Sequence, residues 1–278
     1  MKPARLPENF RFSESSLQDY DDCPRRFRLR YLERLEYSAV QAEPALENER
    51  QQWEGAYFHR LVQQYLLGLP TEKIETLTMT PNVRLWWQNF LVFARANLDG
   101  LTLCLPEVSL SASLAGYRLL AKYDLLALTA DGSVLIYDWK TSRNRPKNEW
   151  LAIRWQTRVY RFLVVCAGAH LNAGKPFEPE QIEMVYWMAN APDEPARFPY
   201  SQAQARRDQD VLAARIAEIA AAEDFSLTED ERQCRFCAYR SYCDRGRLAG
   251  SLEEAVMDDE ADEALFDLNF EQIAEIAF

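Results

Sequence analysis

The sequence contains no long apolar run, no internal repeat and no surplus of basic residues. No apolar stretch approaches the roughly 18 residues of a membrane-spanning helix, so we do not expect a membrane protein. The first residues, Met-Lys-Pro-Ala-Arg-Leu-Pro-Glu-Asn, include no apolar signal region, and we therefore expect a cytoplasmic protein. With 278 residues, 48% of them hydrophobic, the chain is long enough to bury a sizeable core.

The lack of positive charge bears on nucleic-acid binding, which usually requires a basic surface. The chain has 32 Lys and Arg against 43 Asp and Glu, a formal net charge of −11. No Lys or Arg follows Arg247, and ten acids lie beyond Ser251: Glu253, Glu254, Asp258, Asp259, Glu260, Asp262, Glu263, Asp267, Glu271 and Glu275. Without these ten, 33 acids face 32 bases, so the body of the chain can still carry a local basic groove.

Three charged residues interrupt two apolar runs where a buried strand should avoid charge. The runs, Tyr117–Thr129 and Ser133–Thr141, flank Asp131-Gly132, which is the composition of a β-hairpin. The charged residues are Asp124, Asp138 and Lys140. Because strand side chains alternate between two faces, Asp138 and Lys140 share one face.

The register of this hairpin decides whether the two acids meet. If Ala130 to Gly132 form a three-residue loop with Gly132 in the left-handed conformation, Thr129 pairs with Ser133 and Asp124 falls opposite Asp138. A two-residue turn would instead place the acids on opposite faces of the sheet. We predict the three-residue loop. Adjacent like charges repel each other, so an ion between the carboxylates is the natural explanation.

The rest of the chain predicts an α/β fold with a central mixed β-sheet flanked by helices. Helices are expected at 53–67, 82–98, 148–167 and 201–225, and strands at 103–114, 117–129, 133–141 and 181–189. The polar segment 38–50 and the proline-rich segment 191–200 are expected to be loops.

A basic run near the start follows a predicted helix junction. Ser13 or Ser15 can cap a short helix that ends at Asp22, and Pro24 suits the first turn of a second helix. The basic residues are Arg25, Arg26, Arg28 and Arg30. Such a run is either a solvated helix face or a rim that contacts phosphates.

Three cysteines near the end form a C-x2-C-x5-C pattern, Cys234, Cys237 and Cys243. Three thiols this close rarely serve packing, and in a cytoplasmic protein they are expected to be ligands rather than disulfides. Cys104 and Cys166 resemble small buried core residues. Cys23, beside the basic run, is the best fourth ligand.

The spacing of these four cysteines favours an iron–sulfur cluster and leaves a structural zinc ion as the alternative. A zinc ribbon normally has two paired cysteine knuckles, whereas here one pair is joined by a trailing and a remote cysteine. Either group would close a loop of about two hundred residues and restrict the unfolded chain.

Three further residues, His59, Gln156 and Tyr160, are candidates because of the motifs they accompany. A lone histidine among apolar residues, such as His59, is more often a core residue than a ligand. Gln156 and Tyr160 lie one turn apart on a predicted helix.

Together these residues resemble the RecB-type branch of the PD-(D/E)XK nuclease superfamily, and in particular its iron–sulfur members. Those members include the AddB nuclease domain and the CRISPR-adaptation exonucleases. The shared motifs, in chain order, are Ser13-x-Ser15, Cys23-Pro24-Arg25-Arg26-Phe27, His59, Asp124, Asp138-Trp139-Lys140-Thr141-Ser142, Gln156-x3-Tyr160 and the three-cysteine pattern. The glycine that often precedes the second-motif acid is absent, and the chain has no helicase motor.

The resemblance implies a fold and a domain organisation. The fold would be a restriction-endonuclease-like core whose N- and C-terminal segments are joined at a four-cysteine metal cluster. Residues 1–250 would form one nuclease domain, followed by an acidic tail at 251–278. Within it, 12–35 and 226–247 would bind the cluster, and 101–190 would form the catalytic core.

The resemblance also implies roles for individual residues. His59, Asp124, Asp138 and the backbone carbonyl of Trp139 would bind Mg²⁺ or Mn²⁺. Lys140 would orient the attacking water and stabilise charge on the phosphate, with Gln156 and Tyr160 as positioning residues. A [4Fe–4S] cluster would be bound by Cys23, Cys234, Cys237 and Cys243. Candidates for DNA contact are Arg25, Arg26 and Arg30.

Three functions are compatible with these residues. The first is a metal-dependent DNA nuclease that hydrolyses phosphodiester bonds, expected to be an exonuclease acting on single-stranded or free ends. It would serve DNA repair, recombination or defence, with a helicase or other repair or defence protein as a possible partner. The second is a catalytically idle iron–sulfur subunit that binds DNA or acts as a scaffold. The third is an α/β protein with a zinc staple and unrelated acids.

The acidic tail generates a separate prediction. It is a solvated tail, a peptide that binds a partner, or a DNA mimic that occupies the substrate groove. If it is a mimic, deleting residues 251–278 increases the affinity for single-stranded DNA, measured by fluorescence anisotropy at fixed salt. An unchanged affinity contradicts the mimic.

Overall fold

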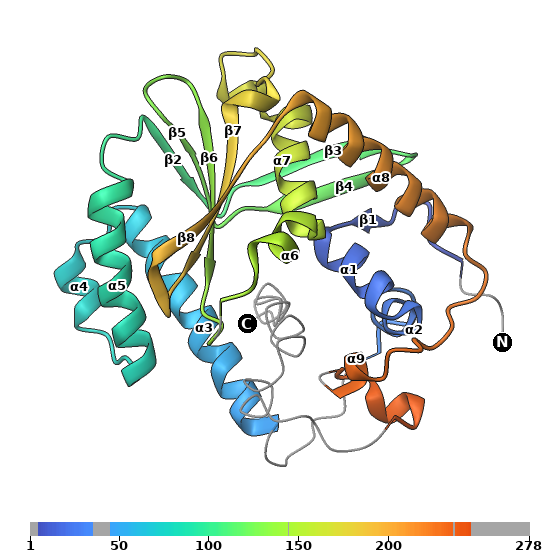
Figure 1. Cartoon of the computed structure of the whole chain (residues 1–278). Coiled ribbons are helices and arrows are strands. Elements are labelled where there is room, and N and C mark those ends of the chain that lie inside the picture. Colours follow the sequence, from blue (N-terminus) through green and yellow to red (C-terminus); the bar gives the residue numbers. More distant parts are fainter. Residues whose placement is uncertain (1–4, 36–44, 144, 236, 246–278) are drawn as a thin grey trace.

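The computed structural model describes residues 5–35, 45–143, 145–235 and 237–245 (Figure 1). The helices are α1 (Glu14–Asp22), α2 (Pro24–Phe27), α3 (Ala45–Leu66), α4 (Thr71–Glu75), α5 (Pro81–Asn97), α6 (Asn148–Ile153), α7 (Trp155–Ala167), α8 (Gln202–Ala221) and α9 (Arg232–Arg235). The strands are β1 (Arg11–Phe12), β2 (Leu103–Pro106), β3 (Ser109–Leu114), β4 (Tyr117–Lys122), β5 (Leu125–Leu128), β6 (Val134–Lys140), β7 (Ile182–Met188) and β8 (Ala191–Pro199).

The strands form two sheets. The larger has the order β2-β5-β6-β7-β8, in which β6 and β7 are parallel and the other pairs antiparallel. The smaller has the order β1-β4-β3. Helices α3, α4 and α5 lie on one side of the larger sheet, and α7 and α8 on the other (Figure 1). The predicted α/β class, with a mixed central sheet between helices, is confirmed.

Alternating side chains of β6 enter two hydrophobic cores. Tyr137 and Trp139 pack among the aromatic residues of α3 and α5. Ile136 belongs to the core beneath α7 and α8. Asp138 and Lys140 continue the Ile136 face, so β6 presents its two charged side chains toward α7.

The hairpin between β5 and β6 has the predicted register. Thr129 N–H donates to the Ser133 carbonyl at 3.0 Å, and Gly132 has φ of +83°. The left-handed conformation is one that glycine adopts without steric cost, which is why the turn needs it here. The ladder pairs Leu125 with Tyr137, so its continuation by one residue sets Asp124 beside Asp138.

Two of the predicted strands are each split between the sheets. The expected strand 103–114 breaks after Pro106 into β2 and β3, and the expected strand 117–129 breaks after Lys122 into β4 and β5. Hydrogen bonds tie the breaks together: Tyr123 N–H donates to Val108 O at 2.9 Å, and Glu107 N–H to Asp124 O at 3.2 Å. Asp124 therefore lies in a sharp bend at the start of β5 rather than within a strand.

The predicted loop at 191–200 is wrong, because this segment forms edge strand β8. The edge position explains how its prolines fit. Pro192 and Pro195 lie where the pairing with β7 shifts register, and Pro199 lies opposite Glu183. An edge strand tolerates proline because a missing N–H can face away from the ladder.

Two helix predictions also need correction. The expected loop at 38–50 overlaps α3, which begins at Ala45, while residues 36–44 lie outside the described part of the chain. The expected helix at 148–167 is broken at Arg154, whose ψ of 146° is extended. The break starts a new helix at Trp155 and so places Gln156 in its first turn.

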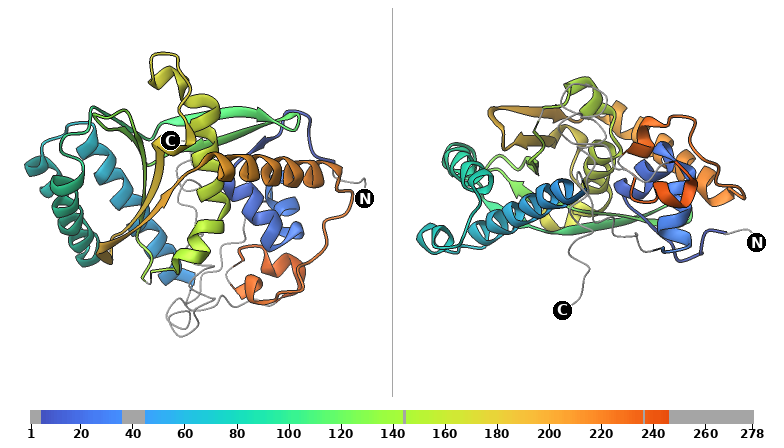
Figure 2. Two further views of the ribbon diagram at one scale, coloured as in Figure 1. Left: turned by 45° about the horizontal axis from the view of Figure 1, so that its top comes forward. Right: turned by 90° about the horizontal axis from the view of Figure 1, so that it is seen from below.

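The N- and C-terminal segments pack against each other. Ser13 caps α1 in the predicted way, accepting from Ser16 N–H at 3.2 Å. Arg25 N–H donates to Ser226 O at 3.0 Å, and Tyr239 Oη donates to Leu35 O at 3.1 Å. Figure 2 shows α9 beside α1 and α2. The acidic tail, 251–278, lies outside the described residues.

Candidate active site

The two predicted acids lie at the ends of β5 and β6 and are held by different partners. Asp124 Oδ2 accepts from the Trp139 backbone N–H at 2.7 Å, across the end of the β5–β6 ladder. Asp138, at 3% exposure, lies on the α7 side of β6. The register thus brings two carboxylates together at a point where little water reaches them.

Asp138, Lys140 and Gln156 form a closed triangle of contacts. Lys140 Nζ lies 2.8 Å from Asp138 Oδ2 and donates to Gln156 Oε1 at 3.1 Å. Gln156 Nε2 donates to Asp138 Oδ1 at 2.7 Å. Burial raises the pKa of Asp138 to about 6, with the Lys140 charge acting against it and the neighbouring Asp124 adding to it.

His59 reaches the same group from α3, on the other side of the sheet. Its Nδ1 lies 3.3 Å from Asp124 Oδ1. Burial acts to lower the pKa of His59, but the charge and hydrogen bond of Asp124, together with the Asp138 charge, outweigh it and the pKa is raised. Burial likewise acts to raise the pKa of Asp124, and His59 together with the Trp139 N–H brings it below its ordinary value.

Tyr160 supports the backbone of the site rather than the carboxylates. Its Oη donates to Lys122 O at 2.8 Å, and Tyr123 Oη donates to Tyr160 O at 2.9 Å. These two bonds tie α7 to the bend that carries Asp124. The structure therefore brings His59, Asp124, Asp138, Lys140 and Gln156 into one network and places Tyr160 beneath it.

Glu14 is a third acid at this site that the sequence did not reveal. It lies in the first turn of α1 at 8% exposure, and its charge interacts with Lys140 and Asp138. Burial raises the pKa of Glu14 to about 7. The main opposing effect is the hydrogen bond from its own backbone N–H, which lowers the pKa. An acid after a serine cap usually indicates only a favourable helix start, so the sequence offers no signal of its burial.

The four predicted cysteine ligands line one pocket, together with Arg26 and Arg240. Burial raises the pKa of Cys234, Cys237 and Cys243, that of Cys237 to about 11, so these three thiols are protonated at neutral pH. In the described part of the chain, no three His, Cys, Asp or Glu side chains are arranged so that they could hold a metal ion.

The remaining two cysteines differ from the expectation that both are core residues. Cys104 is half-buried, and Cys166 is exposed on α7. The prediction of a buried Cys166 was wrong, because the residue falls on the solvent face of an otherwise apolar helix.

Two of the three candidate DNA-contacting arginines are engaged in ion pairs with acids of α1. Arg26 Nε lies 2.8 Å from Asp19 and the same side chain contacts Asp22, while Arg30 Nη1 lies 2.6 Å from Asp19. Arg25 interacts with Cys243, whose thiol it hydrogen-bonds.

Comparison with known proteins places this site in context. The profile of the PD-(D/E)XK nuclease superfamily matches residues 11–244. The chain belongs to the PD-(D/E)XK nuclease superfamily. The match spans both the carboxylate network and the cysteine pocket of this superfamily member. No curated protein matches the sequence.

Two solved structures are similar to this PD-(D/E)XK protein, and the first supports its fold. The chain is similar to a proposed exonuclease from Eubacterium rectale, with 12% identity, a TM-score of 0.50, and coverage of 86% of this chain and 89% of that one. A second similar structure, SSO0001, has 14% identity, a TM-score of 0.38, and coverage of 86% and 87%. Among the described helices, none combines the length and apolar character needed to cross a membrane.

The burial of Glu14 predicts a pH-dependent loss of stability. Its pKa rises from 4.5 to about 7 on folding, so the folded state loses stability as pH rises between these values. At about 1.4 kcal/mol per pH unit the loss has an upper limit of about 3 kcal/mol. In metal-free protein, Glu14→Gln should therefore raise the free energy of unfolding at pH 8 by about 1 to 3 kcal/mol and leave it nearly unchanged at pH 4.5.

Urea denaturation of both proteins at the two pH values measures this difference. Glu8→Gln, at an exposed position before the same helix, is the matched control and should change neither value. A Glu14→Gln protein less stable than the wild type at pH 8 contradicts the prediction.

Proposed function

We propose that the protein is a metal-dependent DNA nuclease, acting as an exonuclease on single-stranded DNA or free ends. The proposal is carried by one observation, the contact of Lys140 with both Asp138 and Gln156 beside a second carboxylate. A lysine, two acids and an amide in one buried network can bind and polarise a phosphate. Membership of a nuclease superfamily supports the hydrolysis of phosphodiester bonds.

The donor set at the site suits a hard divalent cation. Asp124 and Asp138, the Trp139 backbone carbonyl and the His59 imidazole would hold Mg²⁺ or Mn²⁺. The carboxylates now pair with Lys140 and His59, so these contacts must open for an ion to enter. A bound cation would supply positive charge to the scissile phosphate and make a neighbouring water more acidic.

The side chains around this ion site have separate tasks. Lys140, freed from Asp138, orients the attacking water and stabilises the charge that develops on the phosphate. Gln156 holds Lys140 and Asp138 in register. Tyr160 fixes the backbone at Lys122 and so the approach of Asp124.

A catalytically idle DNA-binding or scaffold subunit is the alternative. Such a protein would need neither Lys140 nor the paired acids, and it would tolerate substitution of any of these residues. The described site retains each of these groups, which favours the nuclease.

We further propose that the cysteine pocket holds a [4Fe–4S] cluster, with a structural Zn²⁺ ion as the alternative. Cys23, Cys234, Cys237 and Cys243 line a single pocket although Cys23 is remote in sequence. Loading requires loss of the thiol protons, because metal ligands are thiolates, and it requires the side chains to converge. Such a cluster would place the protein in the RecB-type branch, near the AddB nuclease domain and the CRISPR-adaptation exonucleases.

The same pocket bears on DNA binding and on the domain organisation. Arg26 lines the pocket, and Arg25 contacts Cys243. We propose that Arg25, Arg26 and Arg30 contact phosphates, with Arg26 and Arg30 exchanging their ion pairs with Asp19 and Asp22 for the backbone of DNA. We propose that residues 1–250 form one nuclease domain, that the protein acts in the cytoplasm in repair, recombination or defence, and that a helicase or similar protein is its partner.

Lys140→Ala should lower the rate of DNA degradation by at least about 100-fold, because the charge on the phosphate loses its main protein partner. The assay is degradation of end-labelled single-stranded DNA with Mn²⁺, with and without a chelator. Lys175→Ala, at an exposed lysine outside the network, is the control and should retain full activity. Equal activity of Lys140→Ala and the wild type contradicts the catalytic role assigned to Lys140.

Purification without oxygen should yield a brown protein that absorbs near 400 nm and holds about four iron atoms per chain. Cys237→Ser should lose this absorbance, whereas Cys166→Ser, at the exposed cysteine, should keep it. A colourless protein with one zinc ion per chain would show that the pocket holds zinc instead of the cluster. A protein with neither metal would contradict both.

A further inference from the structure

The side-chain amide of Gln156 can make both of its hydrogen bonds, to Asp138 and from Lys140, in only one of its two orientations. Its Nε2 donates to Asp138 Oδ1 at 2.7 Å, and its Oε1 accepts from Lys140 Nζ at 3.1 Å. Rotation of the amide by half a turn would set oxygen against the carboxylate and the NH₂ group against the ammonium. The orientation is therefore secured at one end by Asp138 and at the other by Lys140, and Lys140 is the partner that must leave Gln156 to reach a phosphate.

Tyr186 stands beside this amide on the neighbouring strand. It pairs with Asp138 in the parallel β6–β7 ladder, so both side chains lie on the α7 face of the sheet. Its side chain is fully buried, its Oη lies 3.4 Å from Gln156 Oε1, and Lys140 Nζ lies 5.7 Å from the centre of its ring. Sequence reasoning missed this residue, because a tyrosine in a buried strand resembles an ordinary core residue.

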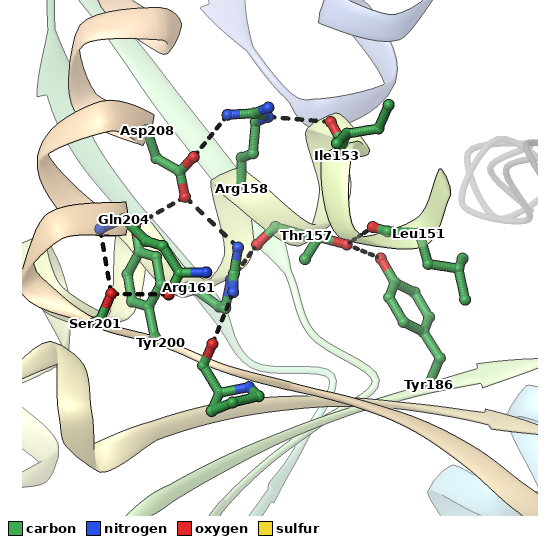
Figure 3. Close-up of polar contacts among 11 residues, drawn as sticks. Leu151, Ile153, Thr157, Arg158, Arg161, Tyr186, Tyr200, Ser201, Gln204 and Asp208 are labelled. Carbon is green, nitrogen blue, oxygen red and sulfur yellow. Dashed lines mark hydrogen bonds and ion pairs between the residues drawn. The ribbon is translucent and has the colours of Figure 1, made fainter. Parts of the chain in front are cut away.

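The hydroxyl proton of Tyr186 can be assigned from its neighbours (Figure 3). The Leu151 carbonyl can only accept, so Thr157 donates to it at 2.6 Å. In the 2.7 Å contact between Thr157 and Tyr186, the tyrosine must then be the donor. Its proton is thus held by Thr157 at rest, within reach of the Gln156 oxygen.

We propose that Tyr186 is a positioning residue that keeps the Gln156 amide oriented when Lys140 moves to the scissile phosphate. This inference rests on the proposed nuclease function. As Lys140 withdraws its hydrogen bond from Oε1, the Tyr186 hydroxyl rotates from Thr157 toward Gln156 and replaces it. Burial raises the pKa of Tyr186 well above its ordinary value, so the hydroxyl keeps its proton.

A second buried polar network lies behind Thr157 (Figure 3). Arg161 Nε donates to Thr157 O at 2.9 Å and Arg161 Nη2 lies 3.6 Å from Asp208. Tyr200 Oη donates to the same carboxylate at 3.0 Å. Tyr200 thus offers a matched control, because it is a buried tyrosine whose hydroxyl donates to Asp208 rather than to Thr157 or Gln156.

The first test does not depend on nuclease activity. Lys140→Ala imitates the state in which the lysine has left Gln156. NMR relaxation then measures the mobility of the side-chain NH₂ group of Gln156, whose signal is assigned by its absence in Gln156→Ala. The amide should remain ordered in Lys140→Ala and in Lys140→Ala/Tyr200→Phe. It should become mobile in Lys140→Ala/Tyr186→Phe, and an amide that stays ordered there overturns the proposal.

The second test uses degradation of single-stranded DNA with Mn²⁺. Tyr186→Phe should lower kcat about 5- to 10-fold with KM within about twofold, as expected for one hydrogen bond made during the reaction. In Gln156→Ala the same change should have no further effect, because the amide it orients is gone. Tyr200→Phe should leave kcat unchanged.

The outcomes separate this proposal from the proposed function. Equal losses of kcat in Tyr186→Phe and Tyr200→Phe, or additive losses with Gln156→Ala, show a purely structural role and overturn it. A wild type that degrades no DNA refutes the proposed function instead, and the mobility of the Gln156 amide then decides the role of Tyr186.

Discussion

The rest of the structure depends on the placement of two carboxylates side by side where water is scarce. The hairpin register brings Asp124 next to Asp138, and their repulsion would destabilise the sheet without opposing charge. Lys140 and His59 supply that charge from different elements. The opposite pKa shifts of the two acids follow from this division, because Asp124 has the better partners and Asp138 the deeper burial.

This arrangement requires both hydrophobic cores at once. His59 is carried by α3, which packs on the face of β6 that holds Tyr137 and Trp139. Gln156 is carried by α7, which packs on the opposite face. The candidate active site therefore lies where the two cores meet, and loosening either helix would separate a partner from its carboxylate. The break at Arg154 contributes to this arrangement, since it places Gln156 in the first turn of α7, within hydrogen-bond distance of Lys140.

Much of this site could be predicted from the sequence, because its signals are local. A glycine in a short turn between two apolar runs fixes the register, and the register fixes which acids meet. The bends at Glu107 and Tyr123 could not be predicted, since they depend on the packing of two sheets. Glu14 and Tyr186 were missed for a related reason. Each has an ordinary local role, and only the tertiary structure turns it toward Lys140.

The prolines of β8 have a consequence for the molecule as a whole. An outer strand with free N–H groups is a template on which another chain can add a strand and start an aggregate. In β8, Pro192, Pro195 and Pro199 remove three such donors, and the shift in register beside Tyr186 bends the strand. Addition of a strand from a second copy at the β8 edge of the sheet is thereby disfavoured.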